Sequence, residues 1–273
     1  MKKAVAAVIV IAIVVLAAFY YLKQGGEEAA PPQTREISVP PAQNEQEKAP
    51  AIKHPIYEIT VGAKKREMPS VRQEAVPTLD RSDGPVREAL SEFIEEKKLQ
   101  NSIIFKNIIR RFVVTVDNLT RQKLPQNYRF VTAIPGQFSV KKSGGKDHYV
   151  LSEQNFHRYD LLVSLAESVN LKQLVILYTR YYSLFQQAYE EMGYPHRYFN
   201  DRLVEVISHL LAAPEPRGPI ELVQPKVFYE FADPKLEKLS AGQKIMIRIG
   251  PDNERRVKDV LRKLRGLLVK SKS

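Results

Sequence analysis

The chain has 273 residues and a formal net charge of +11, from 42 Lys and Arg against 31 Asp and Glu. It contains no cysteine, which excludes a thiolate nucleophile, a cysteine zinc site, disulfide bonds and a lipid-modified N-terminal cysteine. The last 20 residues hold 8 basic and 2 acidic side chains, so the positive excess is concentrated at the C-terminus and does not indicate a polyanion-binding surface over the whole chain.

An uncharged apolar stretch follows the N-terminal lysines. Residues 4–22 contain no charged residue, glycine or proline, and as a helix they would span about 28 Å, the thickness of a bilayer core. Three aromatic residues end the stretch where rings prefer the headgroup level, and Lys2 and Lys3 mark the cytoplasmic end. The sequence therefore predicts a transmembrane anchor at residues 1–22, in the inner (cytoplasmic) membrane, with the N-terminus in the cytoplasm and the C-terminal domain periplasmic or otherwise extracytoplasmic.

A cleaved signal peptide is the alternative interpretation of the same stretch. Val15-Leu16-Ala17 offers a poor small-residue cleavage site. Cleavage there would leave a new N-terminus that is unusually apolar, so the sequence favours the uncleaved anchor.

A proline-rich segment separates the anchor from the rest of the chain. Residues 23–75 are rich in Glu, Gln, Ala and Pro and cannot bury enough apolar surface to offset chain entropy, which predicts a disordered linker. Within it, residues 56–61 are β-prone. They would form a transient extended patch, or add a strand to a sheet of a partner or of the chain itself.

Residues 76–273 are predicted to form one mainly α globular domain with a minor β hairpin. Helix starts are marked by Asp and Ser residues followed by proline or by capping-box spacing, and a glycine and proline near residue 193 mark a helix end. Short alternating runs between residues 119 and 150 predict the hairpin. The expected helices span 82–97, 102–117, 152–168, 170–193 and 200–212, then two short helices after Asp233 and Ser240, and a last helix from Pro251.

Several motifs of this region resemble a bacterial family catalogued only as a domain of unknown function. They are Arg110–Leu119, Tyr194–Leu203, Gly218–Pro225, Phe231–Pro234 and Leu239–Lys244. The resemblance covers most of residues 76–268. It implies a membrane-tethered bacterial envelope protein and supplies no catalytic residue.

The loop before the helix at 200–212 carries aromatic and polar residues that form a candidate interaction site, because functional residues are frequent on loops. The candidate residues are Tyr194, Tyr198, Phe199, Asn200, Asp201 and Arg202. A longer aromatic series between residues 178 and 189 has helical spacing, which favours core packing over ligand stacking.

Two polar clusters raise the possibility of catalysis or metal binding. Asp201, Glu205 and His209 share one helix face and would be the residues of an envelope hydrolase, although an ordinary solvent-exposed face is favoured. His157 and Asp160 are similarly better explained as a helix surface. The sequence thus predicts no catalytic residue, no metal site and no cofactor, and favours a non-enzymatic function.

The C-terminal helix combines an apolar stripe with a basic face suited to anionic lipid or polymer, although a core helix with a solvated charged face is favoured. The candidate anion-binding residues are Arg255, Arg256, Arg262, Lys263 and Arg265. No nucleic acid partner is expected for a domain outside the cytoplasm. The expected function is a single-pass membrane-anchored envelope protein that binds a protein or cell-wall partner. The envelope hydrolase and the anionic-surface binder are the alternatives.

Overall fold

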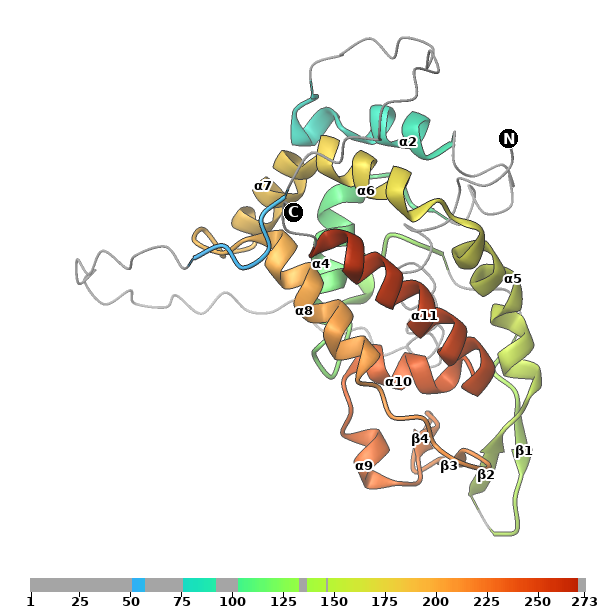
Figure 1. The fold of residues 1–273 in the computed structure, drawn as a ribbon. Coiled ribbons are helices and arrows are strands. Elements are labelled where there is room, and N and C mark those ends of the chain that lie inside the picture. The colour runs from blue at the N-terminus through green and yellow to red at the C-terminus, as the bar shows by residue number, and fades with distance from the viewer. Residues whose placement is uncertain (1–50, 57–75, 92–102, 133–136, 146, 270–273) are drawn as a thin grey trace, which may run out of the picture.

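The computed structural model describes residues 51–56, 76–91, 103–132, 137–145 and 147–269, which form nine α-helices and a small antiparallel sheet (Figure 1). The predicted mainly α class is therefore confirmed for this part of the chain. The predicted anchor at residues 4–22 and most of the predicted linker lie outside it. No single described helix is both long and apolar enough to cross a membrane, whereas the bent pair formed by residues 154–168 and 171–180 meets the length and composition criteria together.

The helices are α2 (Asp83–Ser91), α4 (Ile108–Asn118), α5 (Gln154–Ser168), α6 (Leu171–Arg180), α7 (Tyr182–Glu191), α8 (Phe199–Leu211), α9 (Pro234–Glu237), α10 (Ala241–Arg248) and α11 (Pro251–Leu268). The strands are β1 (Val140–Lys142), β2 (His148–Leu151), β3 (Glu221–Val223) and β4 (Glu230–Phe231). Two 3₁₀ turns, Leu79–Arg81 and Gln126–Tyr128, complete the regular structure of the described residues.

Helix α4 begins later than the sequence predicts. Ile103 forms a β-bridge with Val131, so this stretch is extended and not helical. Asn107 then has a left-handed backbone, with φ of 53°, and the helix starts at Ile108. The carboxylate of Asp83 caps this start from α2 by accepting the N–H groups of both Asn107 and Ile108. The boundary is set by a residue 24 positions away, which local helix signals do not reveal.

The single helix predicted for residues 170–193 is two helices, α6 and α7, separated at Tyr181. Asn170 caps the first helix through Gln173, and Gly193 has the left-handed backbone expected past the second, so both ends are confirmed. Tyr181 itself departs from helical geometry, with φ of −99° and ψ of 10°. The bend allows the side chains of Tyr178 and Tyr181 both to be buried in the same core.

The predicted hairpin exists, and it belongs to a larger sheet. Strands β1 and β2 pair antiparallel, β3 adds to β2, and β4 adds to β3, which gives the order β1-β2-β3-β4. The two added strands flank a turn 70 or more residues after β2, so their pairing depends on tertiary contacts. A small core of Leu151, Ile220, Leu222, Phe231 and Ile247 lies beneath the sheet.

The main core lies between the helices. Helix α11 packs against α5, α6 and α8, while α4 packs against α7 and α8. Figure 1 shows α8 beside α11, with α10 between these helices and the sheet. This arrangement brings the C-terminal end of α4 close to α8 and α10.

Candidate functional site

Asp117, near the C-terminal end of α4, is the centre of a buried polar network. Its side chain is 3% exposed, and its carboxylate accepts hydrogen bonds from Arg202 Nε and Arg121 Nη2, both at 2.8 Å. The Arg202 guanidinium also bonds the Asp117 carbonyl and the hydroxyl of Thr120. Burial would lower the pKa of Arg202, but Asp117 and Glu205 raise it above its ordinary value. Arg202 therefore stays charged and joins α8 to α4.

The segment before α10 joins the same region. The N–H groups of Ala241 and Gly242 donate to the carbonyls of Arg121 and Leu119. A Cβ on Gly242 would lie 2.6 Å from Leu210 Cδ2 and 2.7 Å from the Leu119 carbonyl oxygen, so only glycine allows this approach. Three of the sequence motifs, Arg110–Leu119, Tyr194–Leu203 and Leu239–Lys244, thus meet in one place, which we call the junction.

The N-terminal turn of α8 holds a separate segment, residues 51–56, which we call the strap. The Asp201 carboxylate accepts the backbone N–H groups of Lys53 at 3.0 Å and His54 at 2.6 Å. Asn200 Nδ2 donates to the His54 carbonyl at 2.7 Å. Ile56 packs against the main core. Figure 1 shows the strap, in blue, beside α7 and α8. The strap is recognised through its backbone at two residues and through one apolar side chain.

Both regions of the site involve motifs that extend over most of the domain. A family of proteins matches residues 108–265, and its description is "Protein of unknown function (DUF3014)". The chain belongs to this family. No curated protein and no solved structure matches it. The junction lies wholly inside the DUF3014 region, whereas the strap precedes it and only its binding residues, Asn200 and Asp201, fall within the family match.

The six predicted interaction residues are neighbours on the α7–α8 corner of the DUF3014 domain, and the structure assigns them different surroundings. Phe199 and Asn200 are buried, while Tyr194, Tyr198, Asp201 and Arg202 are partly exposed. The Phe199 ring packs against Phe112, Phe185 and Tyr189. Tyr194 stacks on Tyr189, with ring centroids 4.7 Å apart, and its hydroxyl bonds Arg121. The loop aromatics thus support the junction from the outside.

The residues of the hydrolase hypothesis bind three different groups. Asp201 holds the strap, Glu205 pairs with Arg202, and His209 Nε2 lies 2.7 Å from Ser240 Oγ. Burial, aided by Arg202, lowers the pKa of His209, so its imidazole is neutral at pH 7. Ser240 is 7% exposed and also caps α10 through Gln243.

The His209–Ser240 contact has the separation of a nucleophile and a base. Neither residue lines the apolar cavity between the helices or the cleft between the sheet and α11. Among the described residues, no group of three or more His, Asp and Glu could hold a metal ion.

The basic face of α11 is partly paired within the domain. Arg256 bonds Glu167 and Ser164 of α5, which raises the pKa of Arg256, and Arg255 and Arg262 pair with Asp252 and Asp259 of their own helix. Lys263 and Arg265 are exposed toward the helix end. The cations available to an anionic surface are therefore concentrated in the last two turns.

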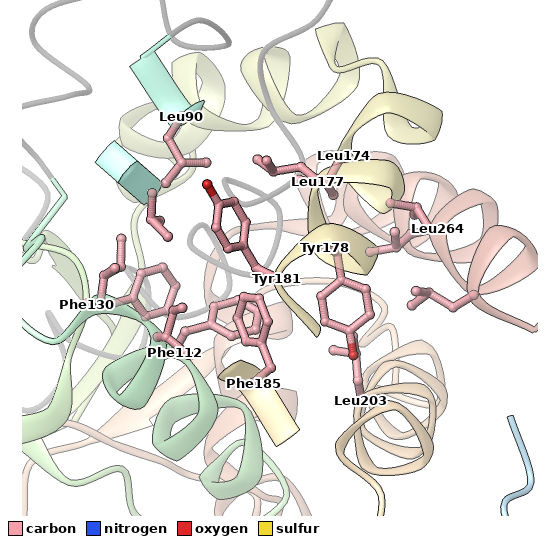
Figure 2. A pocket seen from close by; sticks show the side chains of 15 residues that line it. Leu90, Phe112, Phe130, Leu174, Leu177, Tyr178, Tyr181, Phe185, Leu203 and Leu264 are labelled. Carbon is pink, nitrogen blue, oxygen red and sulfur yellow. The ribbon is translucent and has the colours of Figure 1, made fainter. Parts of the chain in front are cut away.

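An apolar cavity of about 80 Å³ lies between α2, α4, α6, α7, α8 and α11 (Figure 2). Its walls are carbon apart from the tyrosine hydroxyls, and the Tyr181 hydroxyl points between Leu90 and Leu177 (Figure 2). No charged side chain lines it. Its volume is about half that of a cavity known to bind benzene, so it admits only a small apolar group.

The sequence did not indicate that the strap is bound or that Asp117 is buried. Asp117 lies in the motif Arg110–Leu119, and its position beside the apolar stripe of α4 is typical of a buried residue. The binding of residues 53 and 54 to α8 has no comparable signature in the sequence, because it involves their backbone groups and not their side chains.

Proposed function

We propose that this DUF3014 protein is a single-pass membrane protein of the bacterial envelope whose helical domain binds a protein or cell-wall partner and does not catalyse a reaction. Residues 4–22 are long and apolar enough to serve as the anchor, and the flanking lysines favour an extracytoplasmic domain. The linker of residues 23–75 carries the domain away from the bilayer.

The observation that carries this proposal is what the residues of the family motifs bind. Within the described residues, Arg202 bonds Asp117, and the segment 241–242 bonds the carbonyls of Leu119 and Arg121. Asn200 and Asp201 bond the strap. These polar groups act as a scaffold and as a peptide-backbone clamp. A protein that holds a segment of its own linker in this way presents its domain in a defined orientation, which suits docking to a partner.

Partner capture in the native host tests the interaction. A photo-crosslinking residue at position 198 of the full-length protein, next to the strap site, should recover a specific envelope protein or wall fragment. When the same crosslinking residue is placed in a chain that carries Asp201→Asn, the yield of crosslinked partner should change. In a chain that carries Asp259→Asn, on the exposed face of α11, the yield should stay the same. Recovery of nothing above background in the wild-type chain would contradict the proposal.

A reporter fused after Ser273 tests the placement independently. An enzyme that is active only outside the cytoplasm should be active in this fusion, and washed membranes should retain the chain. Activity of a cytosol-only reporter would contradict the predicted orientation.

A second candidate function is favoured by one observation, the exposure of Arg262, Lys263 and Arg265 on the last turns of α11. These cations suit an anionic lipid or polymer. Replacing all three by glutamate should abolish salt-sensitive binding of the full chain to phosphatidylglycerol vesicles. Unchanged binding would exclude this function.

A further inference from the structure

A second polar region lies between the sheet and α11, away from the strap. It is a cleft of about 390 Å³, a volume within the range of small-molecule sites. Most of its walls are apolar, from Phe156 of α5, the loop Pro216–Pro219, Ile220 and Ile247. Gly250 makes this shape possible: its φ is 90°, and a Cβ there would collide with the Phe156 ring.

The buried polar residue of the cleft is Glu254, in the first turn of α11. The residue is 1% exposed, and its Oε1 lies 2.9 Å from Lys258 Nζ. Lys258 is equally buried and donates to Glu215 Oε1 at 2.6 Å and to the Ala213 carbonyl at 2.7 Å. The contact between Lys258 and Glu254 is an ion pair without hydrogen-bond geometry, so the buried Glu254 Oε1 has no hydrogen-bond partner among the described residues.

Lys258 is shared by two carboxylates with different surroundings. Glu215 is half-exposed and also lies in the field of Arg255 and Arg262, whereas the buried Glu254 has Lys258 as its cation and shares it with Glu215. Two further charged residues line the cleft, Lys141 and Glu153; both are exposed and of opposite sign, so they offset each other. Burial raises the pKa of Glu254 to about 7, with Lys258 opposing the shift and Glu215 adding to it. A proton therefore neutralises Glu254 at low pH.

We propose that the cleft binds a primary amine attached to an apolar or ring-shaped body, with the ammonium against Glu254 and the body against Phe156 and the proline loop. The amine supplies a hydrogen-bond donor and a positive charge to the buried Glu254 oxygen, which has no hydrogen-bond partner in the part of the chain that the structure describes, and a charged hydrogen bond is stronger than a neutral one. The apolar walls select the body by burial of its surface. The site requires neither the membrane placement nor the strap, so its test is independent of the proposed function.

Three probes of similar size and different charge test the proposal on the full-length chain in neutral detergent micelles. Benzylamine should bind at pH 8, where Glu254 is ionised, and benzyl alcohol and benzoate should bind roughly tenfold more weakly or worse, because they lack the cation. Benzylamine affinity should fall as the pH drops from 8 to 6. Equal binding of all three probes, or no benzylamine binding at pH 8, would overturn the proposal.

Two variants test the Glu254 carboxyl and the volume of the cleft separately. Glu254→Gln keeps the volume and leaves Lys258 its bonds to Glu215 and Ala213, and it should reduce benzylamine affinity by roughly tenfold or more. Val150→Phe fills the cleft without changing a charge and should also block binding. Glu88→Gln, on the exposed face of α2, should bind as wild type does. Benzylamine binding that survives both Glu254→Gln and Val150→Phe would refute the assignment.

Discussion

The junction and the cleft each contain a buried carboxylate beside a cation, and they differ in how the carboxylate is hydrogen bonded. At the junction both oxygens of Asp117 accept hydrogen bonds from arginines. In the cleft Lys258 is divided between two glutamates, and Glu254 Oε1 has no hydrogen-bond partner within the described ranges. A carboxylate whose oxygens are bonded internally stabilises the fold, whereas a buried carboxylate oxygen without a partner is able to bind a proton or a ligand.

The largest effect is expected at the junction. Asp117→Ala would leave the Arg202 side chain, which is only 16% exposed, without its main partner, and removal of one member of a buried pair costs about 3–5 kcal/mol of unfolding free energy. The measurement is denaturant unfolding of the purified chain. Asp259→Ala, which breaks the exposed pair with Arg262, is the matched control and should cost less than about 1 kcal/mol. A loss of similar size in both variants would mean that the junction is not the scaffold described.

The second effect concerns pH and the cleft. The pKa of Glu254 is about 7 in the folded chain and near 4.5 when unfolded. The folded state therefore binds more protons between these values, and unfolding free energy falls as the pH rises from about 4.5 to about 7. The fall attributable to Glu254 is about 3 kcal/mol.

Glu254→Gln removes this titrating group, so the variant should not lose unfolding free energy in this way. The unfolding free energy of the variant minus that of the wild type should therefore increase as the pH rises from about 4.5 to about 7. Unfolding followed at several pH values provides the test. Parallel pH profiles for the two chains would show that Glu254 does not titrate there.

The third effect is at the strap. Asp201→Asn removes one of the two acceptors that hold Lys53 and His54, which should weaken the strap by about 1–2 kcal/mol. Trypsin should then cleave after Lys53 roughly tenfold faster, as measured by mass spectrometry. Cleavage at the wild-type rate, with Asp259→Asn as reference, would argue against a bound strap.

The features of the fold that the sequence could predict are those determined by residues close together along the chain. Asn170, Asp233 and Ser240 cap their helices as expected, because a cap involves residues two or three positions apart. The break at Tyr181 was missed, since it contains neither glycine nor proline and follows from how two tyrosines fit the core.

The site was less predictable, because its contacts join distant segments. Glu254 and Lys258 are four residues apart, so their pairing is readable as an i,i+4 contact. Their burial, and the arrival of Glu215 from 43 residues away, depend on the packed fold. Asp201 was singled out as a candidate residue, but the sequence contains no sign of its partner in the strap, which lies 147 or more residues away.

The smallest effect is expected on the basic end of α11. Arg262→Glu disrupts an exposed pair with Asp259, and such pairs contribute about 0–1 kcal/mol. Thermal unfolding should therefore change little even where vesicle binding is lost. A large loss of stability would place Arg262 in the scaffold and not on a surface available to anions.

The contrast between the fully bonded Asp117 carboxylate and the Glu254 carboxylate is tested most directly by titrating the Glu254 carboxyl itself. Carbon-13 NMR of the labelled side chain, assigned with Glu254→Gln, would follow its protonation from pH 3 to pH 9. A midpoint near pH 7 that falls when benzylamine is added is the expected result. A midpoint near 4.5, unaffected by the amine, would contradict the account of the cleft.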